Sequence, residues 1–286
     1  MKALHLRAYA KINLGLDVLR KREDNYHEVR MIMQTIDLYD KLSMKILNTN
    51  EIKLTTNLSF LPTNENNLVY KGVKLLKEEF HIEKGVQIHL EKHIPVSAGM
   101  AGGSSDCAAA LKGMNTLFKL GLSTEELRSR GVKLGADVPY CILGGTALSQ
   151  GIGEILTPVS PMPKCHFLIV KPNLHVSTKF VYEHLDLPNL KEHPDIDGII
   201  AAIEDKNIFG IASRLKNVLE SVTIKEHPEI GELKDLMMEH GALGSLMSGS
   251  GPTVFGIFNN LPLLEKACLA CKKQDKNNRV YLVKIK

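Results

Sequence analysis

Apolar and polar residues alternate along residues 10–18 of the chain. The apolar positions in this segment are Ala10, Ile12, Leu14, Leu16 and Val18. A period of two is typical of a β-strand that buries one face, because successive side chains of a strand point to opposite sides. The pattern therefore predicts a half-buried strand that carries Lys11 and Asn13 together on its polar face.

Other segments show either strand-like or helix-like patterns. The sequence predicts strands at residues 28–37, 40–47, 86–91, 166–171 and 279–285, and helices at residues 68–80, 229–240 and 261–273. Residues 244–258 predict two strands joined by a glycine turn. Because strands and helices do not alternate regularly, we expect an α+β fold rather than a doubly wound sheet.

A glycine-rich loop lies between a predicted strand and a predicted amphipathic helix, at residues 95–105. Gly99, Gly102 and Gly103 let the backbone approach a ligand closely. Ser104 and Ser105 are expected at the helix start, where free N–H groups, the helix dipole and their own hydroxyls favour an anion. These features predict a phosphate site, although a plain turn with a serine cap remains an alternative.

The loop matches neither of two common nucleotide-binding patterns. No lysine follows its last glycine, which excludes a Walker A loop, and its glycine spacing differs from that of dinucleotide-binding folds. The following helix is expected to end near Gly121. Ser123 and Glu126 form a capping-box signature, so another helix should begin there.

The composition is that of a globular protein and excludes several functions. The 286 residues are 44% hydrophobic and 24% charged, which allows a full core. The net charge of +4 is spread along the chain, so no nucleic-acid partner is expected. No apolar run reaches the roughly 20 residues of a membrane span. We therefore expect a cytoplasmic protein without a membrane partner.

Cysteines and prolines indicate how the chain is organised. The five cysteines are an odd number and imply no disulfide framework. Cys268 and Cys271 form a C-x-x-C within a predicted helix and are interpreted as ordinary thiols. Three prolines within residues 157–163 favour a semi-rigid connection. We therefore predict two domains, at residues 1–160 and 161–286.

Two further segments carry candidate chemistry. Gly135-Ala-Asp-Val-Pro139 presents the carboxylate of Asp137 in a tight turn, and residues 247–255 contain a second glycine turn. Each has a simpler interpretation, since a turn aspartate often caps a helix and a glycine turn often closes a hairpin. A lone strand lysine such as Lys11 is likewise often only solvated.

Taken together, these motifs resemble those of the GHMP kinases. The similar segments are the loop at residues 95–105, Gly135-Ala-Asp-Val-Pro139 and Ser248-Gly-Ser-Gly-Pro-Thr253. Residues 8–17, 22–27 and 176–182 are similar, more narrowly, to the 4-diphosphocytidyl-2-C-methyl-D-erythritol kinase family. The six motifs occur in order over nearly the whole chain.

The resemblance implies a two-domain kinase with its active site in the cleft between domains and with ATP and Mg²⁺ as cofactors. Lys11 and Asp137 would be catalytic, with Asp137 as general base and Lys11 as its partner. The loop would bind ATP through Pro95, Val96, Ser97, Ala98, Gly99, Met100, Ala101, Gly102, Gly103, Ser104 and Ser105. No acidic residue is singled out as a metal ligand.

The resemblance also implies a substrate, a cytidine diphosphate alcohol whose 2-hydroxyl is phosphorylated in non-mevalonate isoprenoid synthesis. Candidate substrate-binding residues are Asn13, Tyr26, His27, Thr178 and Tyr182. Tyr26 and Tyr182 would sandwich the cytosine, Asn13 would lie near the methylerythritol hydroxyls and His27 would hydrogen-bond the base edge. Asn67, Leu68 and Lys92 are weaker candidates for the adenine side.

Two other functions stay open from the sequence. One is a GHMP kinase that acts on a different small alcohol, and the other is a nucleotide-binding protein without catalysis. The chain also departs from the family pattern. Ala101 stands where the family has glycine, and we expect it to take an ordinary φ. Asn25 also stands where the family usually has glycine. Asp106 stands where asparagine is more usual and is expected to point away from the triphosphate.

Overall fold

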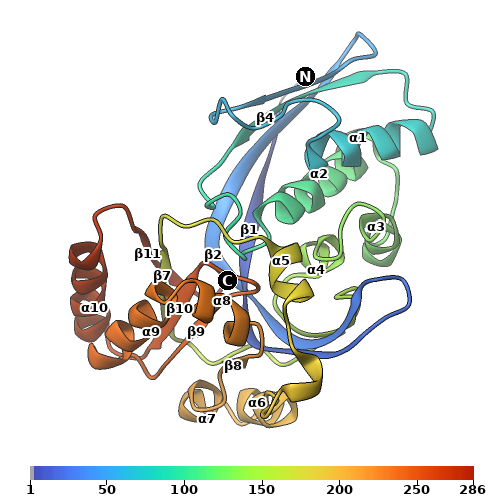
Figure 1. Cartoon of the computed structure of the whole chain (residues 1–286). Helices are drawn as coiled ribbons and strands as arrows, with labels where there is room; N and C mark the ends of the chain where they lie inside the picture. The colour runs from blue at the N-terminus through green and yellow to red at the C-terminus, as the bar shows by residue number, and fades with distance from the viewer. Residues whose placement is uncertain (1–2) are drawn as a thin grey trace. The chain divides into compact units, whose positions relative to one another are not determined.

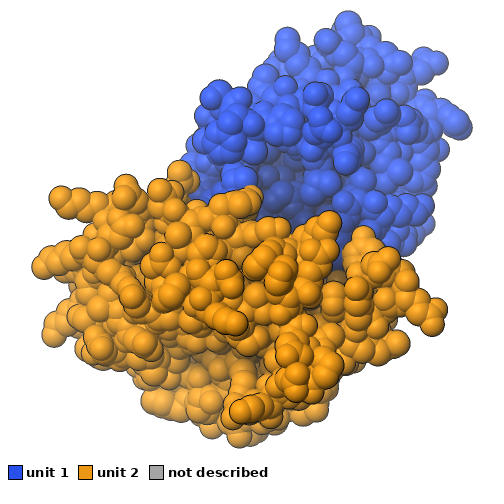
Figure 2. Space-filling model, viewed as in Figure 1, with its two compact units in different colours: residues 1–10, 38–96, 101–144 blue, residues 11–37, 97–100, 145–286 orange. Residues whose placement is uncertain are grey.

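The computed structural model describes residues 3–286, which form two compact units built from segments that are not continuous in sequence (Figure 1). Figure 2 colours each unit separately. Unit 1 holds the residues up to Ala10 together with Leu38–Val96 and Ala101–Gly144. Unit 2 holds Lys11–Asp37, Ser97–Met100 and Gly145–Lys286. The two predicted domains, residues 1–160 and 161–286, are continuous segments, whereas these units are not, so the predicted domain division stays a prediction.

Unit 1 combines a sheet with four helices. Its strands are β1 (Leu4–Lys21), β2 (His27–Leu47), β3 (Ile52–Thr56) and β4 (Gly85–Glu91), of which β1 and β2 continue into unit 2. They lie in the order β3-β4-β2-β1, with β4 antiparallel to β2 and parallel to β3. The helices are α1 (Leu68–Glu79), α2 (Gly102–Phe118), α3 (Thr124–Gly131) and α4 (Val138–Leu143).

Helices α1 and α2 pack against each other and lie on the same side of this sheet (Figure 1). Their apolar faces join the sheet in one core that includes Leu42, Ile88 and Leu111. Gly113 lets α2 lie close to the strands, since a Cβ there would be 2.3 Å from the sulfur of Met44. Full burial of each leucine or isoleucine contributes about 1.5–3 kcal/mol, and this core holds the start of α2 in place.

Unit 2 contains the remaining elements. Its further strands are β5 (Thr146–Gly151), β6 (Ile155–Pro158), β7 (His166–Lys171), β8 (Lys216–Asn217), β9 (Gly244–Met247), β10 (Val254–Phe258) and β11 (Arg279–Lys284). Its helices are α5 (Thr178–Glu183), the 3₁₀-helix η1 (Leu187–Asn189), α6 (Ile196–Glu204), α7 (Ile208–Ala212), α8 (Glu220–Glu226), α9 (Glu229–Glu239) and α10 (Leu261–Gln274).

The strands of unit 2 belong to two sheets. An antiparallel sheet has the order β11-β7-β10-β9, and α9 and α10 pack on it. The other is the seven-stranded sheet that also contains β3 and β4; in it β8 pairs parallel with β1, and β5 lies antiparallel to both β2 and β6. The predicted α+β class is therefore confirmed. No helix within residues 3–286 combines the length and apolar character that a membrane crossing requires.

Many predicted elements are present, but several details of the prediction are wrong. Residues 28–37 and 40–47 form one continuous strand, β2, which pairs with β5 over residues 29–34 and with β4 over residues 41–47. Helix α2 ends at Phe118, before Gly121, because Lys119 takes the left-handed conformation that closes it. Strand β5 was not predicted, and the proline-rich stretch begins inside β6.

The first strand also differs from its prediction in a way that matters for the site. Residues 10–18 of β1 are buried on both faces, including Lys11 and Asn13. Further along the same face, Gly15 lies against α6, where a Cβ would be 2.8 Å from the Cδ1 atoms of Ile196 and Ile199. The alternating pattern located the strand correctly, but it could not indicate that the polar face is covered.

Candidate active site

The glycine loop has three residues with positive φ before helix α2 begins. These are Ser97 at 52°, Gly99 at 68° and Ala101 at 54°. The expectation that Ala101 takes an ordinary φ is therefore wrong, since it forms the left-handed N-cap of α2. An L-residue in this conformation costs about 1–2 kcal/mol relative to the right-handed one. The surrounding fold must hold the loop in this shape.

Helix α2 begins at Gly102, two residues before the predicted start, so Ser104 is its third residue. The first N–H groups of a helix have no intrahelical acceptor and attract anions, aided by the helix dipole. The backbone N–H of Ser105 donates to the carbonyl of Ala101 at 2.9 Å, and its hydroxyl donates to the carbonyl of Tyr9 at 2.6 Å. Ser105 therefore does not supply the extra hydroxyl donor that was expected.

Asp137 precedes the short helix α4 and is half-buried. Its side chain makes no capping hydrogen bond to that helix, so the interpretation of Asp137 as an ordinary cap is not supported. A Cβ on Gly135 would lie 3.8 Å from the Ser104 hydroxyl oxygen, which places the turn beside the start of α2. Within unit 1, the candidate base therefore comes from a turn that neighbours the end of the glycine loop.

Lys11 borders the part of the loop that belongs to unit 2. Its backbone N–H donates to the carbonyl of Met100 at 3.2 Å, and its ammonium donates to Oδ1 of Asn13 at 2.8 Å. Lys11 is 5% exposed and Asn13 is fully buried. Burying an ammonium is costly unless polar groups receive it, so the alternative of a merely solvated strand lysine is excluded.

The second glycine turn, residues 248–253, supports the first loop within unit 2. The Ser248 hydroxyl donates to the carbonyl of Gly99 at 2.9 Å. A Cβ on Gly99 would lie 2.2 Å from the Ser248 carbonyl oxygen, so only glycine fits there. The turn is more than a hairpin connection, because it holds the glycine loop directly.

Asn217 is a supporting residue that the sequence analysis missed. Its Nδ2 donates to the carbonyls of Met247 at 2.9 Å and Gly249 at 2.8 Å, and its Oδ1 accepts from the N–H of Leu219 at 3.0 Å. The side chain is buried and uses all three of these bonds to fix the turn. No local motif surrounds Asn217 in the sequence, so only the fold reveals this role.

The candidate base-binding residues all belong to unit 2. The rings of His27 and Tyr182 lie 5.1 Å apart with a tilt of 39°, whereas Tyr26 is 57% exposed. Burial, and next the charge of Lys21, lower the pKa of His27, which favours the neutral ring. Thr178 bonds Ser250 through their hydroxyls at 2.8 Å, which links α5 to the second glycine turn. The cytosine sandwich stays a prediction.

The three weaker adenine candidates have different surroundings in unit 1. Asn67 caps α1 by accepting from the N–H of Val69 and donates to the carbonyl of Pro62. Leu68 lies next to the loop, since a Cβ on Gly103 would be 3.8 Å from its Cδ1. Lys92 is buried, and two carboxylates bind its ammonium. An adenine contact is therefore not supported for Lys92.

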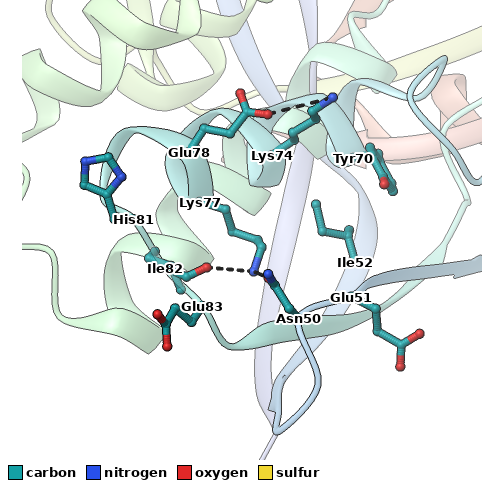
Figure 3. A pocket seen from close by; sticks show the side chains of 10 residues that line it. All are labelled: Asn50, Glu51, Ile52, Tyr70, Lys74, Lys77, Glu78, His81, Ile82 and Glu83. Atoms are coloured by element: carbon teal, nitrogen blue, oxygen red, sulfur yellow. Dashed lines mark hydrogen bonds and ion pairs between the residues drawn. The ribbon is translucent and has the colours of Figure 1, made fainter.

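A separate hollow of about 690 Å³ lies in unit 1 between α1 and the β3 region, and it contains none of the predicted site residues (Figure 3). Lys77 in its wall donates to Oδ1 of Asn50 and to the carbonyls of Ile82 and Lys84. These three bonds use every donor of the ammonium. Lysines and glutamates are mixed along the wall, so we assign no ligand to this hollow.

Residues 3–286 contain no group of three histidine, cysteine, aspartate or glutamate side chains placed to hold a metal ion. Mg²⁺ is often bound through few protein ligands together with substrate phosphates. The side chains described here therefore do not form a protein-only magnesium site.

Comparison with known proteins gives the family. Two family models match the chain, "GHMP kinases N terminal domain" at residues 67–145 and "GHMP kinases C terminal" at residues 184–277. A 4-diphosphocytidyl-2-C-methyl-D-erythritol kinase from Lachnoclostridium phytofermentans is 56% identical over 99% of this chain and 98% of its own. The chain belongs to the 4-diphosphocytidyl-2-C-methyl-D-erythritol kinase family.

Two more distant proteins support the same family and fold. The kinase of this name from Clostridium perfringens is 47% identical over 98% of both chains. A crystal structure of a 4-(cytidine 5'-diphospho)-2C-methyl-D-erythritol kinase is 30% identical, covers 99% of both chains and superposes with a TM-score of 0.84. The predicted resemblance is thereby confirmed, and with it the GHMP kinase fold.

The family models cover only part of the candidate site in this kinase. The first includes the glycine loop and Asp137, and the second includes the turn at residues 248–253. Lys11, Tyr26 and His27 lie outside both models. Their functional interpretation therefore depends on the near full-length similarity and on the geometry around them.

Proposed function

We propose that this chain phosphorylates the 2-hydroxyl of 4-diphosphocytidyl-2-C-methyl-D-erythritol with ATP, a step of non-mevalonate isoprenoid synthesis that takes place in the cytoplasm. The identity of 56% over nearly the full length to a kinase named for this substrate is the observation that carries the proposal. Membership of the GHMP kinases supports ATP as the phosphate donor.

The glycine loop is proposed to hold the ATP phosphates. The free N–H groups at the start of α2 and the positive end of its dipole suit the charge of a triphosphate. Left-handed residues at positions 97, 99 and 101 give the loop a fixed shape before ATP arrives. A preformed loop lowers the entropic cost of ordering when the nucleotide binds. Mg²⁺ would be held chiefly by the phosphate oxygens and would neutralise their charge.

Asp137 is proposed as the general base. Its carboxylate would accept the proton of the 2-hydroxyl as that oxygen attacks the γ-phosphorus of ATP, while the bond from this phosphorus to the bridging oxygen breaks and ADP leaves with the electron pair. General-base help of this kind contributes about 10²–10⁴ in rate. The position of its turn beside Ser104 supports this role, because the transferred phosphate must lie near the start of α2.

Lys11 is proposed to stabilise the negative charge that develops on the substrate oxygen. Its ammonium is buried and bonded to Asn13, so it acts in a medium of lower dielectric than water, where charges interact more strongly. The bond from its backbone to Met100 ties Lys11 to the phosphate loop. Asn13 would orient the methylerythritol hydroxyls next to it.

Tyr26, His27, Thr178 and Tyr182 are proposed to select the cytidine group. Stacking a base on an aromatic ring contributes ~1–3 kcal/mol to binding, as measured by replacing the ring with alanine. A neutral His27 has one donor and one acceptor nitrogen for the polar edge of cytosine. A ligand without a base would gain nothing from these rings, which distinguishes the proposed substrate from other small alcohols.

A coupled assay of ADP release tests the proposal against the alternative of a different alcohol. The purified chain is mixed with ATP, Mg²⁺ and one acceptor, which is the cytidine diphosphate alcohol, homoserine or mevalonate. We expect release of ADP only with the first acceptor. Equal or greater release with either of the others would refute the proposed substrate, and no release above background with any would refute the proposed reaction.

A further inference from the structure

Three ionisable residues form a buried cluster in unit 1, and two of them flank the glycine loop in sequence. Lys92 follows β4, Asp40 lies on β2 and Asp106 lies in the second turn of α2. The Lys92 ammonium binds Oδ2 of Asp40 and, at 2.7 Å, Oδ2 of Asp106. The three side chains are each at most 4% exposed. Such a buried network requires good geometry to offset the cost of removing its charges from water.

The cluster holds the segment that leads into the loop. Oδ1 of Asp40 accepts the backbone N–H groups of His93 and Ile94, the latter at 2.8 Å. These are the two residues directly before Pro95, where the loop begins. Asn57 also holds this segment, through bonds of 2.8 Å and 3.2 Å with the backbone of Lys92. The start of the loop is therefore fixed to β2.

The cluster also holds the segment that leads out of the loop. Asp106 lies four residues after Gly102, the first residue of α2, and its bond to Lys92 ties this helix end to the same site. A Cβ on Gly102 would lie 3.2 Å from the Lys92 ammonium, which shows how closely the ammonium approaches the helix start. Oδ1 of Asp106 is buried without a hydrogen-bond partner among residues 3–286. The carboxyl group is therefore held through its other oxygen, Oδ2, which accepts from Lys92.

From these contacts we propose that Asp106, acting through Lys92 and Asp40, is a positioning residue that fixes both ends of the glycine loop and keeps it ready for the ATP phosphates. The proposal rests on the proposed function, because it assumes that the loop binds ATP. The Lys92 ammonium on this account serves the shape of the loop.

Variants of Asp106 test this role without leaving a buried charge alone. In Asp106→Ala the ion pair of Lys92 with Asp40 remains one to one, whereas removal of Lys92 would leave two buried carboxylates unpaired. Asp106→Asn keeps an oxygen acceptor for Lys92 in the same place. Asn115→Ala is the matched control, because Asn115 lies near the other end of α2 and bonds the backbone of Leu122 in both directions.

Two readouts separate positioning from general stability. Hydrogen exchange measures the opening of residues 93–105 directly and does not depend on any activity. Calorimetry with ADP, and the KM values for ATP and for the cytidine substrate, measure the consequence for the nucleotide. All are recorded well below the melting temperature of each variant, so that only folded protein contributes.

We expect Asp106→Ala to speed exchange in residues 93–105, to weaken ADP binding about tenfold and to raise the KM for ATP similarly, with the KM for the cytidine substrate unchanged. A tenfold change corresponds to ~1.4 kcal/mol, within the range of one lost charge-assisted hydrogen bond. Asp106→Asn should stay within about threefold of wild type on these measures. Asn115→Ala should lower the melting temperature without any of these changes.

The proposal is overturned if Asp106→Ala and Asn115→Ala behave alike in exchange and in nucleotide affinity, or if Asp106→Asn is as impaired as Asp106→Ala. A wild-type protein that binds neither ADP nor ATP would instead refute the proposed function. The exchange data would then still decide whether Asp106 holds the loop.

Discussion

At the residue scale, a few candidate side chains have surroundings that differ from those of ordinary surface groups. Lys11 and Asn13 are buried and bonded to each other, and Asp137 does not cap the helix that follows it. Their residue types and motifs were visible in the sequence. Their burial was not, because it arises from elements far away in the chain.

Replacement of Asp137 by asparagine tests its role as the base. The amide keeps the shape of the carboxylate but cannot accept the proton, so we expect kcat to fall by ~10² or more with both KM values near those of wild type. Steady-state kinetics measure this. Asp235→Asn, on the exposed face of α9, is the control and should match wild type. Unchanged kcat in Asp137→Asn would remove it from the catalytic residues.

Replacement of Tyr182 tests whether this ring stacks on the cytosine of the substrate. Tyr182→Ala removes a stacking surface, and we expect the KM for the cytidine substrate to rise about tenfold while the KM for ATP stays constant. Tyr182→Phe keeps the ring and should behave like wild type. If the KM for ATP changes instead, the ring beside His27 belongs to the nucleotide donor and the base site has been assigned wrongly.

At the element scale, most helices and strands could be predicted from the sequence, but the contacts that hold them in place could not. The alternating pattern of residues 10–18 and the capping box at Ser123 lie within their own elements, so they could be recognised locally. The left-handed Ala101 could not, because alanine rarely takes this conformation and no local sequence signal marks it. Asp106 had no evident partner in the sequence, since Lys92 and Asp40 are distant along the chain.

Asn217 provides a stability prediction for the second glycine turn. Asn217→Ala would leave the carbonyls of Met247 and Gly249 and the N–H of Leu219 buried without their partner. We expect a loss of about 2–4 kcal/mol in the free energy of unfolding, measured with urea. Asn189→Ala, at the exposed end of η1, should change it little. Equal effects of the two substitutions would show that the three hydrogen bonds of Asn217 do not stabilise the protein.

Buried cysteines provide a chemical prediction for helices α2 and α10 and for the segment before β7. Burial raises the pKa of the Cys107 and Cys165 thiols to about 12 and that of Cys271 to about 11. Since the thiolate is the reactive form, we expect these three to resist iodoacetamide at pH 8 in the folded protein and to react after denaturation. Peptide mass spectrometry measures this, and rapid labelling of any of the three in folded protein would contradict it.

At the scale of the whole molecule, the candidate residues are divided between the two compact units. Asp137 and the start of α2 belong to unit 1, and Lys11, Asn13 and the candidate cytidine residues belong to unit 2. The glycine loop belongs to both, with Ser97–Met100 in unit 2 and its flanks in unit 1. The predicted kinase fold is confirmed, whereas the discontinuous make-up of the units could not be predicted, because β1 and β2 each contribute to both.

The most direct test of the account is the identity of the phosphorylated product. The chain is incubated with ATP, Mg²⁺ and 4-diphosphocytidyl-2-C-methyl-D-erythritol, and the mixture is analysed by ³¹P NMR and mass spectrometry. We predict one new phosphate monoester on the 2-hydroxyl, formed together with an equal amount of ADP and formed ~10²-fold or more slowly by Asp137→Asn. Loss of ATP without that monoester, or a phosphate at another position, would contradict the account.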